Sequence, residues 1–157
     1  MEDEISGARL EEFSPRMSAL RKEISAMLDK AENVDYSLRL PDAEYDVMAA
    51  IWNGDIPVTT AYLMDRIGKE RGWKAPTLIS FLVRLEERGY IYSIKKGKER
   101  LYFPLAKRDV YIRAVTADFM RKYHENSFLH LLDALFPDGI SNGADVDALL
   151  AWLRSRK

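Results

Sequence analysis

Cysteine and histidine, two residue types that can act as nucleophiles or metal ligands, are scarce in this sequence. It contains no cysteine, which excludes disulfides, thiolate metal sites and cysteine nucleophiles. Its two histidines, His124 and His130, lie six residues apart, whereas a zinc-protease motif needs two histidines four apart on one helix face. Six residues correspond to about 600° of helical rotation. We therefore expect the two rings on different faces, as ordinary surface or interface histidines.

Glycine-rich and serine-based catalytic motifs are also missing. The sequence has no Gly-x-Ser-x-Gly elbow, no Walker loop and no dinucleotide-binding fingerprint. We therefore expect the protein to have no enzymatic activity, no cofactor and no resident metal.

Basic side chains gather in one segment. Residues 66–100 carry ten lysines and arginines and four acidic residues, a net charge of +6, although the whole chain has a net charge of −1. Residues 41–65 carry five acidic residues and no basic one. A polyanion would therefore meet one local face of the protein. The alternative is that these charges only solvate helix faces.

Length and hydropathy limit the class of protein. A chain of 157 residues with 47% hydrophobic residues can form one domain, or a small domain with appendages. No apolar run approaches the ~18 residues of a membrane helix. The sequence begins Met-Glu-Asp-Glu, acidic where a secretion signal would be basic. We expect a soluble, cytoplasmic protein without membrane insertion.

An amphipathic helix is predicted near the start, from Pro15 to Glu32, after a loosely ordered stretch over residues 1–13. Ser14 supplies an N-cap and Pro15 occupies the first helical position. A free helix of this length is marginal in water, so its apolar stripe is expected to pack on a body. We favour the partner subunit over the helix's own domain. The stripe consists of Met17, Leu20, Ile24, Met27 and Leu28.

Three further helices and a hairpin are predicted next. The helices begin at Pro41-Asp42, at Thr59 or Thr60, and near Pro76, and the last runs to Arg88. This last helix has a buried stripe at positions i, i+3, i+4 and i+7. Residues 90–95 and 100–103 read as strands joined by a loop over residues 96–98. The buried stripe is Leu78, Phe81, Leu82 and Leu85.

Three helices followed by a basic hairpin are typical of a winged helix-turn-helix, in which the third helix enters the major groove. Polar side chains on its outer face can bond phosphates or base edges, and the wing lysines can bind phosphates. Ile79 and Val83 lie on the same outer face. They would contact thymine methyl groups or pack on a neighbouring segment. The predicted DNA-binding residues are Lys74, Thr77, Ile79, Ser80, Arg84, Lys95, Lys96, Lys98 and Arg100.

The C-terminal third is predicted to form three more helices, over residues 109–123, 127–136 and 142–156. Together they carry more apolar surface than three loosely attached helices could hide, which indicates a two-fold dimer interface. The predicted dimerisation residues are Val115, Phe119, Phe128, Leu131, Leu132, Leu135, Val146, Leu149, Leu150 and Leu153.

Three motifs resemble the penicillinase repressor family (the BlaI/MecI/CopY type). Residues 40–52, Leu-Pro-Asp-Ala-Glu-Tyr-Asp-Val-Met and then Ile-Trp, resemble its opening helix. Residues 77–91, with Thr-Leu-Ile-Ser-Phe-Leu-Val-Arg-Leu and Arg-Gly-Tyr-Ile, resemble its reading helix and the stop that follows. Residues 100–104 resemble the second wing strand. The resemblance covers about residues 40–125.

The resemblance implies a homodimeric repressor that binds a palindromic operator, with antibiotic-resistance or cell-wall-stress genes as targets. In the antibiotic-responsive branch a membrane sensor metalloprotease signals, and the repressor is cut within its dimerisation helices. The corresponding bond here joins Asp118 and Phe119. The copper-responsive branch binds metal through cysteine pairs, which this chain lacks.

The expected fold class is mainly α (α+β). It has an N-terminal acidic extension with an amphipathic helix (residues 1–39), a winged helix-turn-helix domain with a two-stranded wing (residues 40–106) and a helical dimerisation region (residues 107–157). The alternative function is a winged-helix module for ligand sensing or protein interaction that represses no specific operator.

Overall fold

The computed structural model describes residues 14–140 and 142–156, with side chains from residue 18 onward. The expectation for residues 1–13 lies outside this part. Contacts divide the chain into two units, residues 1–112 and residues 113–157. Each unit is described by itself.

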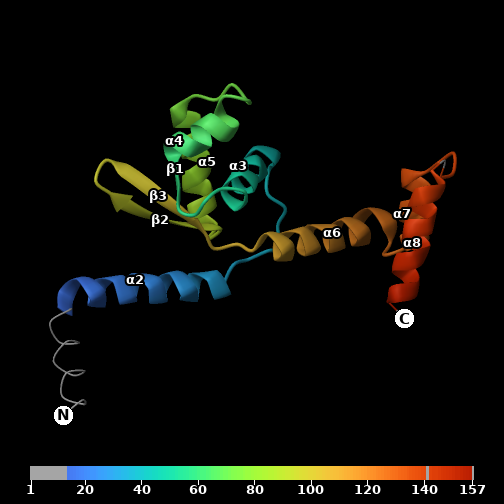
Figure 1. The fold of residues 1–157 in the computed structure, drawn as a ribbon, viewed down its shortest axis with the longest axis horizontal. Helices are drawn as coiled ribbons and strands as arrows, with labels where there is room; N and C mark the ends of the chain where they lie inside the picture. Colours follow the sequence, from blue (N-terminus) through green and yellow to red (C-terminus); the bar gives the residue numbers. More distant parts are fainter. Residues whose placement is uncertain (1–13, 141, 157) are drawn as a thin grey trace, which may run out of the picture. The chain divides into compact units, whose positions relative to one another are not determined.

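The first unit has a helical core that supports a hairpin (Figure 1). Its helices are α3 (Asp42–Trp52), α4 (Thr60–Leu63) and α5 (Ala75–Glu87). A π-helical turn, η1 (Met64–Gly68), extends α4. The α5 residues Leu78, Leu82 and Leu85 are buried, as the predicted stripe requires, and Phe81 is half-buried. The core contains mainly aliphatic side chains: Leu40, Val47, Met48, Ile51, Leu63, Leu78, Leu82 and Leu85.

Local signals set the ends of these helices. The Thr59 hydroxyl accepts a hydrogen bond from the Tyr62 N–H at 3.1 Å and so caps α4. Pro76 lies in the first turn of α5, and Gly89 follows the helix with φ +74°, a conformation that favours glycine. These predicted boundaries are confirmed. The π-helical turn after α4 was not predicted.

The sheet has three strands instead of the predicted two. Strand β1 (Val58–Thr59) pairs antiparallel with β3 (Glu99–Pro104), which pairs with β2 (Ile91–Lys96). The sequence indicates a short extended segment over residues 56–58, but only the tertiary pairing shows that Val58 and Thr59 form a strand of the sheet. Lys96 pairs with Glu99 in the ladder. The predicted three-residue loop is therefore the two-residue turn of Gly97 and Lys98.

Helix α2 (Ser14–Glu32) forms where it was predicted, but its stripe is not covered within the described residues. Leu20, Ile24 and Leu28 are 46%, 44% and 56% exposed. The Met17 side chain lies outside the described part. The Lys30 ammonium group lies 5.1 Å from the centre of the Tyr92 ring. Docking of the stripe on its own domain is therefore not seen, and docking on a partner subunit remains a prediction.

The second unit is helical. Helix α6 (Arg108–His124) begins in the first unit and continues into the second, followed by α7 (Phe128–Leu135) and α8 (Gly143–Ser155). Ser127 caps α7 by accepting from the His130 N–H, and Asn142 caps α8 by accepting from the Ala144 N–H. The three predicted helices are confirmed.

The prediction that the two histidines lie on different faces is wrong. His124 is buried, and its Nδ1 lies 3.1 Å from Nδ1 of His130, so one ring donates a hydrogen bond to the other. Glu125 and Asn126 have positive φ angles of 52° and 60°, and they end α6 before α7 begins. The rotation argument assumed one continuous helix, which this turn interrupts. The described residues contain no cluster of three or more potential metal ligands.

Candidate nucleic-acid interface

The outer face of α5 is the exposed side of the helix whose inner stripe fills the core. Thr77 and Arg84 are exposed, Ser80 is half-buried, and Lys74 stands exposed just before the helix. Ile79 and Val83 are 45% and 48% exposed, so neither is buried on a neighbouring segment. The structure thus gathers the predicted residues of this helix on one accessible face.

Contacts within α5 hold two of these polar groups. The Ser80 hydroxyl donates to the Thr77 carbonyl oxygen at 2.7 Å, which leaves its lone pairs free to accept. The Arg84 guanidinium lies 5.8 Å from the centre of the Phe81 ring. Phe81 in turn packs on Trp73, with ring centres 4.9 Å apart.

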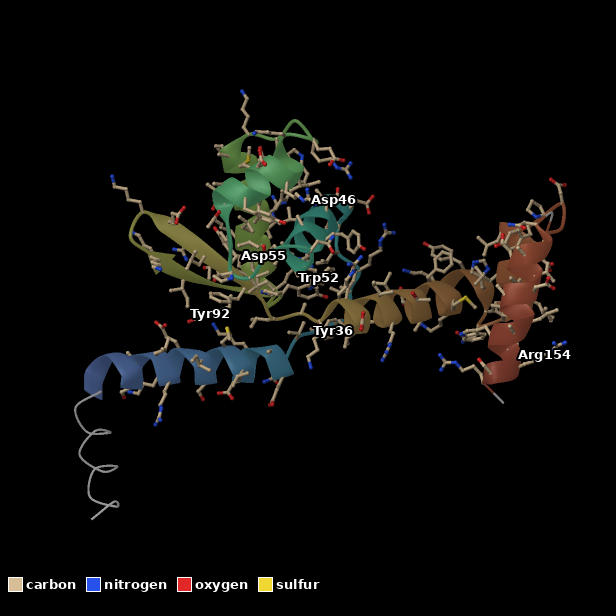
Figure 2. The ribbon with its side chains drawn as sticks, viewed as in Figure 1. Tyr36, Asp46, Trp52, Asp55, Tyr92 and Arg154 are labelled. Atoms are coloured by element: carbon tan, nitrogen blue, oxygen red, sulfur yellow. The ribbon has the colours of Figure 1, made fainter. Side chains whose placement is uncertain are left out.

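An ion pair between a buried carboxylate and a partly exposed guanidinium joins α3 to the end of α5. Glu44 of α3 is 2% exposed, and its Oε2 lies 3.0 Å from Nε of Arg88 at the C-terminal end of α5. The geometry of this contact is not that of a hydrogen bond, so the attraction between the two groups is mainly ionic. A second pair joins Arg71 to Asp46 at 2.6 Å (Asp46 is labelled in Figure 2). Both pairs anchor α3 to the segments that flank the exposed face of α5.

The wing does not present its basic side chains as one row. Lys95 pairs with Arg100 and Ser93 with Tyr102, so these four share one face of the hairpin. Lys96 lies on the opposite face, and Lys98 lies in the turn. All four predicted wing cations are exposed.

A groove of about 310 Å³ lies between the wing, the start of α4 and Ile79. Thr59 and Thr60 were not among the predicted contacts. Their position beside a predicted helix start was the available signal, because such hydroxyls can also bond phosphates. The lining residues are Thr59, Thr60, Ala61, Ile79, Lys98, Glu99, Arg100 and Tyr102.

Hydrogen bonds connect α5 to both strands of the wing. Oε1 of Glu86 accepts from the Ser93 N–H at 3.0 Å and from the Ser93 hydroxyl at 2.7 Å. Nη1 of Arg100 donates to the same hydroxyl oxygen at 2.7 Å. Nothing in the sequence pattern indicated this chain of contacts.

The model of the family described as Penicillinase repressor matches residues 40–155 of this chain. The chain belongs to the penicillinase repressor family. It is therefore a DNA-binding transcriptional regulator with a winged-helix domain, in which α5 is the third helix of the core and β2 and β3 form the wing.

Several solved structures are similar to this family member. The DNA-binding domain of the repressor BlaI is 27% identical, with a TM-score of 0.43, over 46% of this chain and 88% of that one. Monomeric BlaI of Bacillus licheniformis, solved with the blaP half-operator, is 27% identical, with a TM-score of 0.41, over 48% and 90%. BpsR of Bordetella bronchiseptica is 15% identical, with a TM-score of 0.39, over 91% and 93%. No curated protein matches the chain significantly.

The ten predicted dimerisation residues lie in the second unit of this penicillinase repressor family member, and none of them is buried. The half-buried ones are Val115, Leu131, Leu132, Val146 and Leu149. The exposed ones are Phe119, Phe128, Leu135, Leu150 and Leu153.

The bond between Asp118 and Phe119 lies inside α6. The Asp118 carboxylate pairs with Arg121 and, at 4.0 Å, with Lys122. The exposed Phe119 ring packs on Tyr123 and His124, with ring centres 5.4 Å and 5.0 Å apart. A protease would have to unwind this turn before it could cut the bond. No helix among the described residues is long and apolar enough to cross a membrane.

Proposed function

We propose that this protein is a homodimeric repressor that binds a palindromic operator through α5 and the wing. One observation carries the proposal. The exposed face of α5 joins polar and basic residues with two half-exposed aliphatic residues, Ile79 and Val83, beside a wing with four exposed cations. Hydrogen-bonding groups next to apolar groups suit base edges and thymine methyls. The cations suit the phosphates on either side.

Binding to a dyad-containing duplex from upstream of the gene tests this assignment. The triple variant Lys95→Ala, Lys96→Ala, Lys98→Ala should weaken binding on every duplex and make the salt slope shallower by up to ~0.9 per lost contact. Ser80→Ala and Ile79→Ala should instead change which bases are preferred. The control removes two exposed cations from α2, Arg21 and Lys22, and should keep the wild-type slope. Equal affinity of the wing variant and the wild type at low and high salt would refute the assignment.

We also propose that the second unit forms the dimer, because none of its ten predicted dimerisation residues is buried within the described chain and five of them are exposed. A two-fold pair would bury them and match half-sites a whole number of helical turns apart. In this proposal the extension is residues 1–39, the DNA-reading domain is residues 40–106 and the dimerisation region is residues 107–157. The first turn of α6 also packs on the DNA-reading domain. A chain ending at residue 112 should sediment as a folded monomer that binds the operator weakly. A truncated chain that sediments as a dimer would contradict this proposal.

Relief of repression by a membrane sensor metalloprotease would require cleavage between Asp118 and Phe119. This cut would separate the reading domain from its dimer contacts and forfeit the advantage of linked half-sites. N-terminal sequencing of fragments from cells exposed to a cell-wall antibiotic tests the step. Full-length protein under complete induction would instead support a mechanism without cleavage.

A further inference from the structure

Ser93 lies at the centre of the hydrogen-bond chain between the reading helix and the wing. Its hydroxyl has one proton, which it donates to Oε1 of Glu86 at 2.7 Å, and its oxygen accepts from Nη1 of Arg100 at 2.7 Å. The Ser93 N–H donates to the same Glu86 oxygen at 3.0 Å. An alanine at this position could neither donate to the carboxylate nor accept from the guanidinium.

Arg100, whose guanidinium donates to Ser93, lines the groove between the wing and the start of α4. Arg100 shares this groove with Thr60, Ile79 and Lys98. The strand register places Arg100 and Ser93 on the same face of the hairpin. A guanidinium has five N–H donors in a fixed plane, so one bond to Ser93 orients the plane and leaves the other donors for a phosphate.

We propose that Ser93 is a positioning residue for DNA binding, which holds the Arg100 guanidinium ready to bind a backbone phosphate at the groove. The inference rests on the proposed operator binding. Without the contact to Ser93, the Arg100 side chain would have to become ordered when DNA binds. This ordering has an entropic cost, which weakens the complex. The side chain would also be free to pair directly with the Glu86 carboxylate, which would compete with the phosphate.

Substitution of Glu86 provides a test, because electrostatics alone and the positioning role of Ser93 predict opposite changes in DNA affinity. Glu86→Ala removes a negative charge beside the DNA-facing surface, so electrostatics alone predicts tighter binding. The positioning role predicts weaker binding, because Ser93 loses the acceptor that orients its hydroxyl. Glu86→Gln keeps an acceptor oxygen and should retain the wild-type affinity or exceed it.

A double-mutant cycle measured on the operator duplex over a range of salt concentrations tests the proposal directly. Ser93→Ala should weaken binding about tenfold, since the lost contact is a hydrogen bond to a charged group. Its salt slope should stay near the wild-type value, because Arg100 keeps its charge. Arg100→Ala should make the slope shallower by ~0.9. The double variant should bind no more weakly than Arg100→Ala alone.

Two further variants separate positioning from folding. Ser93→Thr keeps the hydroxyl and should restore binding, while Ser25→Ala, an exposed serine of α2, should have no effect. Losses that add in the double variant, or wild-type affinity of Ser93→Ala, would overturn the positioning role and leave operator binding intact. A wild-type protein with no affinity for the duplex would overturn both the proposed function and this inference.

Discussion

The backbone N–H of Leu40 donates a hydrogen bond to the phenolic oxygen of Tyr111 at 2.9 Å, across 71 residues of sequence. Tyr111 belongs to the first turn of α6 and is buried against Tyr45, Trp52 and Tyr90, with ring centres 5.8 to 6.1 Å apart. The start of the predicted dimerisation region is therefore part of the core that carries α5.

Neighbouring contacts strengthen this connection. The Trp52 indole N–H donates to the Ala106 carbonyl oxygen at 2.8 Å, and the Lys107 N–H donates to the Tyr36 hydroxyl at 2.8 Å (Trp52 and Tyr36 are labelled in Figure 2). The Tyr90 hydroxyl donates to the Asp35 carbonyl oxygen at 3.0 Å. The aromatic cluster thus ties the segment before α3 and the segment before α6 to one core.

Tyr111→Phe should lower the free energy of unfolding by about 1–2 kcal/mol, because the buried Leu40 N–H loses its acceptor while the ring remains. Denaturant unfolding followed by tryptophan fluorescence measures the change. Tyr123→Phe is the matched control, since Tyr123 is 62% exposed, and it should change stability little. Equal stability of the two variants would show that the hydrogen bond contributes nothing.

Stability should fall as the pH rises from about 10 to 12. Burial raises the pKa of Tyr90 to about 12 from its ordinary value of 10.0, and burial also raises the pKa of Tyr111. Above pH 10 the unfolded chain releases these protons while the folded chain retains them, so each pH step favours unfolding. Equilibrium unfolding at several alkaline pH values tests this. Tyr90→Phe should make the decline shallower, and an unchanged decline would assign it to other groups.

Arg88→Met should destabilise the protein by about 2 kcal/mol, because it leaves the buried Glu44 carboxylate without its cation; the loss is smaller than for a fully buried pair because the Arg88 side chain is 38% exposed. The pair Arg39 and Asp42, with a 2.6 Å contact between exposed side chains, provides the control. Arg39→Met should cost less than about 1 kcal/mol. The combined Glu44→Gln, Arg88→Met variant should recover part of the loss. If Arg88→Met and Arg39→Met lower the free energy of unfolding by the same amount, the burial of Glu44 does not determine the strength of its ion pair.

Deleting residues 1–32 should weaken dimerisation and leave the winged unit folded. The deletion removes the exposed stripe of α2 but keeps Asp35 and Tyr36, whose contacts hold the segment before α3. Sedimentation over a range of concentrations gives the dimer constant. A melting temperature lowered equally at all protein concentrations would instead place the stripe on its own subunit.

Much of the winged domain could be predicted from the sequence, because its signals are local. The spacing of Leu78, Leu82 and Leu85 predicts the buried side of α5, and therefore also its exposed side. Thr59 or Thr60 predicts a helix start and Gly89 a helix end, since a side-chain cap and a left-handed backbone each act within a few residues; the structure assigns the cap to Thr59. The family motifs extended the same reasoning to the functional class, which the match over residues 40–155 confirmed.

Only the tertiary structure decided the contacts between residues distant in sequence or beyond an unpredicted turn. Val58 and Thr59 form a strand because β3 offers them partners, and His124 meets His130 because a turn at Glu125 and Asn126 interrupts the helix. The bond between Leu40 and Tyr111 depends on the aromatic core that surrounds it. Periodicity reports which side of an element is apolar, but the identity of its partner depends on how all elements pack together.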